Sequence, residues 1–302
     1  MTQLATRPIE ALEKPREERN RSAGSTRRRL LRVLLHVVVI VFMVIWFTPI
    51  LGLFVTSLRT PADIAGNGWW NAVLSPLLTG YNYQRALSVV GVGDSLLTSL
   101  AIALPTTIIT TVISAIGAFA LTRMSFVGRT LVSLVLVAML VVPPQVTLVP
   151  LLRLYSDIGL QGAIPGVWIY QVGFTVPFGV FLIRGFIAAM PEEIFEAASL
   201  DGATLFRSFT AIVIPLALPV LASLAILQFM WSWNDLLIPL LFLGGSDVPA
   251  PITVAVAGLV QSNGQNENLL MAATFISVLP PLIVLIALQR YFVRGVLGGA
   301  VK

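Results

Sequence analysis

The sequence predicts an all-α polytopic membrane protein with six transmembrane helices. Its composition is the first observation: 57% of the 302 residues are hydrophobic and 11% are charged, whereas soluble domains carry about 25% charged residues. The second observation is a set of six long apolar stretches, each long enough to cross about 30 Å of hydrocarbon. A chain so poor in charge cannot cover a water-facing surface, so most of its surface must face lipid or partner helices.

Residues 1–32 are expected to form a disordered basic tail ahead of a membrane domain over 33–302. The tail is charged, lacks apolar periodicity and contains Pro8 and Pro15, a composition that cannot bury enough apolar surface to fold. The run Arg27–Arg29 is either a topology signal or a contact with anionic membrane lipid.

The first apolar stretch is too long for a cleavable signal peptide and is not followed by a small-residue cleavage site. A further apolar run, 236–243, is too short to span and is expected to be re-entrant or interfacial. The six expected spans are 33–58, 95–122, 131–152, 164–189, 208–230 and 269–292.

The distribution of basic residues predicts that both termini are cytoplasmic. With six spans and an inside N-terminus, all but three of the 19 Lys and Arg residues fall on the inside, as the positive-inside rule requires. The three outside are Arg59, Arg85 and Arg153.

Proline occurs in every expected span after the first. An interior proline removes a backbone hydrogen bond and kinks the helix, and membrane helices tolerate this where neighbours or water satisfy the freed carbonyl. The pattern fits a bundle that moves around a central cavity, although ordinary membrane-helix proline usage also accounts for any single position. These prolines are Pro105, Pro143, Pro144, Pro177, Pro215, Pro219, Pro280 and Pro281.

The segment 191–202, between the fourth and fifth spans, reads as a short helix outside the membrane. Pro191 suits a first helical turn, and Glu192 and Glu193 lie near the positive end of the helix dipole. Gly202 permits the positive φ of a helix end. The segment therefore predicts an exposed helix joined by a sharp turn to the fifth span.

One face of this helix is suited to docking. Ile194, Ala197 and Ala198 form a patch of apolar and small side chains, and Glu196 stands beside it as a lone carboxylate. The patch would fit a cleft on a partner protein, and an inert amphipathic interface helix remains the alternative.

The same segment resembles the "EAA" motif of binding-protein-dependent ABC importer permeases. The resemblance implies a coupling helix that docks on a cytoplasmic ATPase, with Glu196 making a charged contact and Gly202 permitting the turn. The matching residues are Glu196, Ala197, Ala198, Asp201, Gly202 and Ala203, followed by Phe209, Ile212, Pro215 and Pro219.

A second stretch narrows the resemblance to the MalG-like members of the carbohydrate subfamily. Residues 229–243 read FMWSWNDLLIPLLFL and match F-x-W-x-W-N-D/E-x-x-x-P-L-x-F; the tail 291–302 is also similar, and the resemblance covers 33–302. It implies a bacterial cytoplasmic-membrane permease for a di- or oligosaccharide. The implied partners are a second, MalF-like permease, a homodimeric cytoplasmic ATPase and an extracytoplasmic sugar-binding protein.

Four residues of this stretch are candidates for the substrate path. The indole faces of Trp231 and Trp233 can stack on the C–H face of a pyranose, and Asn234 and Asp235 can hydrogen-bond hydroxyl groups. An interfacial aromatic belt together with a helix cap is the alternative interpretation.

Several motifs are absent from the sequence. It has no G-x-x-x-x-G-K-[ST] loop, so ATP hydrolysis is expected on a separate chain. Cysteine is absent and His36 is the only histidine, which excludes thiolate and histidine-based metal sites and cysteine nucleophiles. We also expect no metal, cofactor or catalytic residue in this chain, and no nucleic-acid partner. The rival functions are a related permease for a non-sugar solute, a secondary transporter and an intramembrane enzyme.

Overall fold

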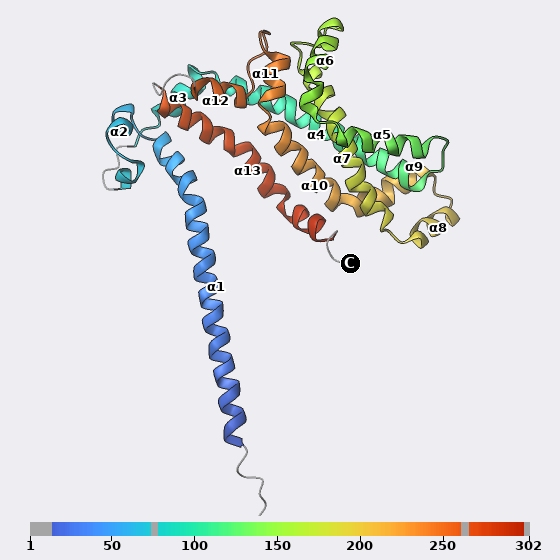
Figure 1. The fold of residues 1–302 in the computed structure, drawn as a ribbon, viewed down its shortest axis with the longest axis horizontal. Helices are drawn as coiled ribbons and strands as arrows, with labels where there is room; N and C mark the ends of the chain where they lie inside the picture. Colours follow the sequence, from blue (N-terminus) through green and yellow to red (C-terminus); the bar gives the residue numbers. More distant parts are fainter. Residues whose placement is uncertain (1–13, 74–77, 261–265, 299–302) are drawn as a thin grey trace, which may run out of the picture. The chain divides into compact units, whose positions relative to one another are not determined.

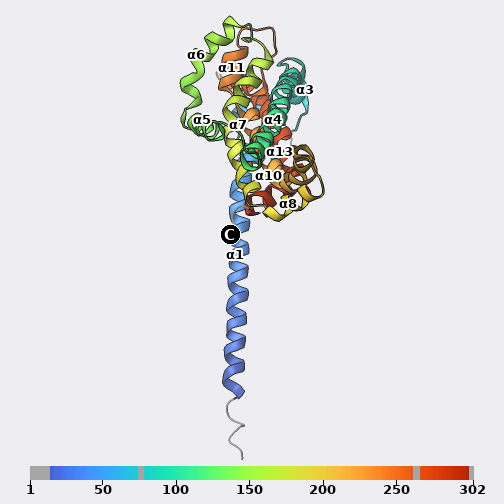
Figure 2. The same ribbon diagram turned by 90° about the vertical axis from the view of Figure 1, so that its right-hand side faces the viewer.

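The computed structural model describes residues 14–73, 78–260 and 266–298, and every regular element in these ranges is helical (Figures 1 and 2). The chain divides into two units, residues 1–55 and 56–302. The helical content agrees with the predicted all-α class, because a backbone in lipid must satisfy its own hydrogen bonds and a helix does so within one segment.

The first unit contains most of helix α1 (Lys14–Ser57), whose apolar part Arg29–Ser57 is long enough to cross a membrane. The helix begins at Lys14, so residues 14–32 are helical where a disordered tail was expected. Residues 1–13 of that expected tail lie outside the described residues.

The second unit is built on four long helices that pack side by side. Helix α4 packs against α7 and α10, and α10 also packs against α13. The elements of this unit are α2 (Pro61–Gly66), a 3₁₀ turn (Trp69–Val73), α3 (Tyr81–Ser88), α4 (Val92–Arg123), α5 (Arg129–Val141), α6 (Pro144–Asp157), α7 (Ile164–Ala188), α8 (Glu192–Leu200), α9 (Leu205–Ser208), a π-helical turn (Phe209–Val213), α10 (Ile214–Asn234), α11 (Leu237–Leu243), α12 (Ile252–Val260) and α13 (Glu267–Gly298).

The third expected span, 131–152, is not one continuous helix. Helices α5 and α6 meet at an angle of 103°, because Val142 and Pro143 have extended backbones and Pro144 opens the second helix. In the described residues, five helices are long and apolar enough to cross a membrane, and there are six only if this bent pair counts as one span.

Helix α4 contributes to three buried clusters and is the centre of the second unit. Its Phe119 packs with α7 and α10, its Ala103 with α10, α12 and α13, and its Ile102 with α6, α7 and α11. A Cβ atom added to Gly179 of α7 would collide with Ser114 of α4, so a small residue allows these two helices to approach closely.

Helices α8 and α11 lie at different ends of the second unit in both ribbon views (Figures 1 and 2). The chain reaches α8 from the end of α7 and returns along α10 to α11. Each end carries one of the two regions that the sequence singled out.

Candidate functional site: a polar cavity and an exposed helix

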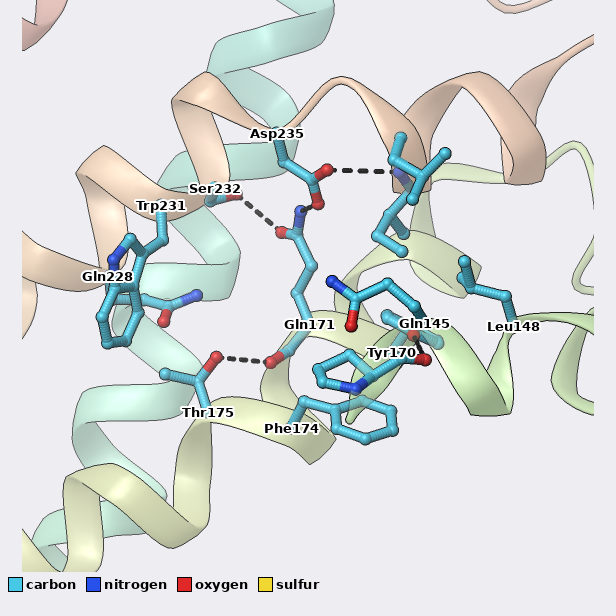
Figure 3. Close-up of a pocket in the computed structure, with 13 residues that line it drawn as sticks. Gln145, Leu148, Tyr170, Gln171, Phe174, Thr175, Gln228, Trp231, Ser232 and Asp235 are labelled. Atoms are coloured by element: carbon cyan, nitrogen blue, oxygen red, sulfur yellow. Dashed lines mark hydrogen bonds between the residues drawn. The ribbon is translucent and has the colours of Figure 1, made fainter. Parts of the chain in front are cut away.

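A cavity of about 490 Å³ opens between α6, α7, α10 and α11 (Figure 3). Its size lies within the range of small-molecule sites, which hold about 300–1,000 Å³. The residues that line it are Pro144, Gln145, Leu148, Tyr170, Gln171, Phe174, Thr175, Gln228, Trp231, Ser232, Asp235, Leu237 and Ile238.

Gln171 of α7 forms the centre of the polar wall. Its Nε2 donates to Asp235 Oδ2 at 2.9 Å, and its Oε1 accepts from Ser232 Oγ at 2.7 Å (Figure 3). Both ends of the amide are therefore bonded to α10 or to the residue that follows it. Since Gln171 and Ser232 are buried, this pair of bonds sets the register between the two helices at the cavity.

Asp235 connects the cavity to the helices that follow. Its Oδ1 accepts from the amide of Ile238 at 3.2 Å, and its backbone carbonyl accepts from Thr253 Oγ1 at 3.0 Å. It lies one residue beyond the apolar span that ends at Asn234. Burial raises the pKa of the Asp235 carboxyl, while hydrogen bonds from Gln171 and from backbone amides act in the opposite direction.

Aromatic rings form the apolar walls. Tyr170 packs on Phe174 with 4.8 Å between ring centroids, and its hydroxyl donates to the Pro144 carbonyl at 2.8 Å. Trp231 makes an edge contact with Phe178 at 5.3 Å and is 49% exposed. Uncharged hydrogen-bonding groups beside exposed ring surface suit a ligand that carries hydroxyl groups on an apolar frame.

Gln228 contributes an acceptor that the protein leaves unused. Its side chain is 1% exposed and lines the cavity, and within the described part of the chain its Oε1 has no hydrogen-bond partner. A buried acceptor without a partner costs about 1–3 kcal/mol, so a hydroxyl group that reached it would be favoured.

The four residues predicted for the substrate path separate into two pairs. Trp231 and Asp235 line the cavity. Asn234 does not, because its side chain is exposed and its Nδ2 donates to the Met230 carbonyl one turn back, at 2.8 Å.

Trp233 also points away from the cavity. It is 3% exposed, stacks on Phe229 with 5.6 Å between ring centroids, and donates from Nε1 to the Ser277 carbonyl of α13 at 3.1 Å. Successive residues of a helix project about 100° apart, so Trp231 and Trp233, two positions apart, point about 200° from each other and cannot share one wall.

Sequence reasoning missed Gln145, Tyr170, Gln171, Gln228 and Ser232 as lining residues. The available signal was a side-chain amide inside an otherwise apolar span, where a polar group is costly unless it is paired. Gln171 and Gln228 each stand in such a stretch.

The second predicted region is present as helix α8, which ends in a Schellman turn. Gly202 has a φ of 74°, the amide of Ala203 donates to the Ala198 carbonyl at 2.9 Å, and the amide of Gly202 donates to the Ser199 carbonyl at 3.0 Å. These two bonds define the motif. The positive φ expected at Gly202 is confirmed.

The motif residues of α8 lie at the surface. Glu196 and Ala197 are exposed, Ala198 and Ala203 are half-buried, and Phe195 packs on the core cluster of α4, α7 and α10. The exposed Asp201 ends the helix. Helix α8 is therefore anchored by one ring and presents its carboxylate and small side chains outward.

The chain resembles known transport proteins over most of its length. The family model described as "Binding-protein-dependent transport system inner membrane component" matches residues 111–298. The osmoprotective compounds uptake permease protein GgtD of Synechocystis sp. is 44% identical over 272 residues, which cover 89% of this chain and 91% of that protein.

Two further matches extend this likeness. The alpha-glucoside transport system permease protein AglG of Rhizobium meliloti is 44% identical over 239 residues, covering 78% of this chain and 63% of that protein. A chain of a bacterial ABC transporter involved in the import of alginate, an acidic polysaccharide, has the same fold, with a TM-score of 0.66 and 23% identity over 87% of this chain and 97% of that chain.

Proposed function

Because this chain belongs to the family of binding-protein-dependent transport system inner membrane components, we propose that it is the membrane-spanning permease subunit of an ATP-driven sugar importer. The sugar is a di- or oligosaccharide delivered by an extracytoplasmic binding protein. A homodimeric cytoplasmic ATPase and a second, MalF-like permease complete the transporter in the bacterial cytoplasmic membrane.

Helix α8 is the element that carries this proposal. It is exposed, it presents Glu196 and Ala197 outward, and it ends in the turn at Gly202. In our proposal both termini and α8 are cytoplasmic, the ATPase grips α8, and ATP-driven closure moves it. Alternating access at the cavity follows, because α7 and α10, two of the helices that line the cavity, also pack in the core cluster that Phe195 of α8 joins.

A sugar is the substrate class that best suits the cavity. Amide and hydroxyl groups of Gln171, Gln228 and Ser232 provide uncharged partners for hydroxyl groups, and Trp231 offers an exposed ring. The name of the relative AglG refers to alpha-glucosides. The alternatives are a non-sugar solute, carried by a permease of the same family, and a secondary transporter.

The direct test is reconstitution of the chain with its partner permease, ATPase and binding protein in lipid vesicles. We expect radiolabelled sugar uptake that requires ATP. Glu196→Arg should reduce co-purification of the ATPase and abolish uptake, because it places a like charge against the basic partner group expected there. Asp157→Arg, an exposed charge reversal on α6, is the matched control.

The outcomes separate the alternatives. Uptake by this chain without an ATPase would support a secondary transporter. Normal uptake and ATPase binding by Glu196→Arg would contradict the proposed role of α8. A panel of labelled sugars, polyols and non-sugar solutes would identify the substrate.

A further inference from the structure

Among the interior prolines of the described helices, Pro105 and Pro281 each leave one helix carbonyl without its usual partner. In an α-helix the amide of residue i donates to the carbonyl of residue i−4, and proline has no amide hydrogen. Pro105 of α4 therefore frees the carbonyl of Ala101, and Pro281 of α13 frees the carbonyl of Ser277.

Each of these carbonyls accepts a hydrogen bond from a tryptophan on a neighbouring helix. Trp168 Nε1 of α7 donates to the Ala101 carbonyl at 2.9 Å, and Trp233 Nε1 of α10 donates to the Ser277 carbonyl at 3.1 Å. The two pairs share no residue and no helix, yet both place an indole at the carbonyl four residues before a proline.

Tryptophan suits this position for physical reasons. An unsatisfied carbonyl in a membrane interior costs several kcal/mol, and the indole provides one N–H donor on a large apolar ring. The ring of Trp233 packs in a cluster with Ala272 and Ala273 of α13, so packing and the hydrogen bond hold the same two helices together.

Both tryptophans lie beside the polar network of the cavity. Trp168 precedes Gln171 by three residues, about one helical turn, and Trp233 directly follows Ser232. Ser232 and Gln171 are hydrogen-bonded to each other. Each of these proline-containing helices, α4 and α13, is thus hydrogen-bonded to a segment that carries one half of the Gln171–Ser232 pair.

We propose that Trp168 and Trp233 are positioning residues for transport, resting on the proposed function above. Their indole N–H groups hold the proline-containing segments of α4 and α13 against the cavity-lining parts of α7 and α10. When the cavity changes shape, these segments move with it. Trp233 acts through Ser277 and does not touch the sugar.

Crossed double-mutant cycles test the pairing. Trp233→Phe removes the N–H group and keeps an aromatic ring, whereas Pro281→Ala restores a backbone amide that can bond to the Ser277 carbonyl. Trp233→Phe should therefore cost less in the Pro281→Ala background. Trp168→Phe and Pro105→Ala form the second cycle, and the mismatched combinations should be additive because they share no partner.

Two measurements on the purified, full transporter complex are needed. In melting experiments, each tryptophan variant should lower the melting temperature of the complex. This decrease should be at least halved when the matched proline is also replaced, that is, Pro281→Ala for Trp233→Phe and Pro105→Ala for Trp168→Phe. It should be unchanged when the other proline is replaced. In vesicles, Trp233→Phe should lower the maximal uptake rate per complex about three- to tenfold, the equivalent of one hydrogen bond. The half-saturating sugar concentration should change less than twofold. Trp70→Phe, at a 62% exposed tryptophan, is the control and should change neither.

The proposal is overturned if matched and mismatched cycles give the same coupling, or if Trp233→Phe acts mainly on the half-saturating sugar concentration, as a sugar contact would. The two independent pairs keep the test decisive where one variant fails to assemble. A wild-type complex that takes up no sugar would refute the proposed function, while the melting cycles would still confirm or refute the paired hydrogen bonds.

Discussion

The guanidinium of Arg123 lies over the ring of Phe195, with 3.8 Å between Cζ and the ring centroid. Arg123 ends α4, and Phe195 is the half-buried ring of α8. The same guanidinium donates to the carbonyls of Ile187 and Met190, at 3.1 and 3.2 Å, at the end of α7. One side chain thus joins the exposed helix to the ends of two long helices.

This contact predicts that Phe195→Leu weakens the coupling between ATP hydrolysis and uptake. Leucine keeps apolar bulk but loses the ring face, which is worth about 0.5–2 kcal/mol to a nearby cation. We expect an assembled complex whose sugar-to-ATP ratio in vesicles is several-fold lower. Phe126→Leu, at an exposed ring in the loop after α4, should retain the wild-type ratio, and an unchanged ratio in Phe195→Leu would refute the role of this contact.

Gly202→Ala is expected to destabilise the end of α8. No atom lies within 4 Å of the position where a Cβ would stand, so the cost is the φ of 74°, about 1 kcal/mol for a residue with a side chain. We predict weaker ATPase co-purification. Gly185→Ala, in the helical backbone of α7 with open space around it, is the matched control. Equal co-purification by both variants would contradict the argument.

Asp235→Ala should impair transport more than Asp235→Asn. Alanine leaves the Gln171 amide and the Ile238 N–H without their acceptor, at about 1–3 kcal/mol per buried group, whereas asparagine keeps one acceptor oxygen. Uptake rates per complex should fall about tenfold or more for alanine and less for asparagine. Asp247→Ala, at an exposed aspartate beyond α11, should behave as wild type, and the reverse order of the two Asp235 variants would be inconsistent with the network.

Trp231→Ala and Asn234→Ala should have different effects, although the two residues are three apart. Trp231 lines the cavity and offers its ring to a ligand, whereas Asn234 bonds only to its own helix at the surface. We expect about a tenfold loss of uptake rate for Trp231→Ala, from lost ring contact, and a change within about twofold for Asn234→Ala, as for most surface substitutions. Labelled uptake at saturating binding protein measures both, and a larger effect at Asn234 would contradict the assignment of the cavity.

The long helices were predictable because their apolar runs have only one stable form in lipid. The expected spans 95–122, 164–189 and 208–230 correspond to α4, α7 and α10 within a few residues. For the run 131–152, the proline pair predicted a kink, but the sequence did not give its size: the angle of 103° between α5 and α6 depends on what each helix packs against. Tyr170 of α7, which bonds to the Pro144 carbonyl, is one such contact.

The cavity could be predicted only in part. Trp231 and Asp235 stand in a recognisable stretch, but Gln171 lies 61 residues from Ser232 and 64 from Asp235 along the chain. Nothing local in the sequence specifies which face of α7 meets α10, so the network could not be assembled from spacing.

The sequence by itself determined that most of the chain's surface faces lipid or partner helices, that the fold is helical, and that the chain turns at Gly202. Composition, the length of apolar runs and backbone freedom are properties of short segments. Tertiary structure alone decided which of the two motif tryptophans, Trp231 or Trp233, faces the cavity and which bonds to the helix beside it. That choice depends on the rotation of α10 against α7 and α13, and rotation is set by packing between residues far apart in the chain.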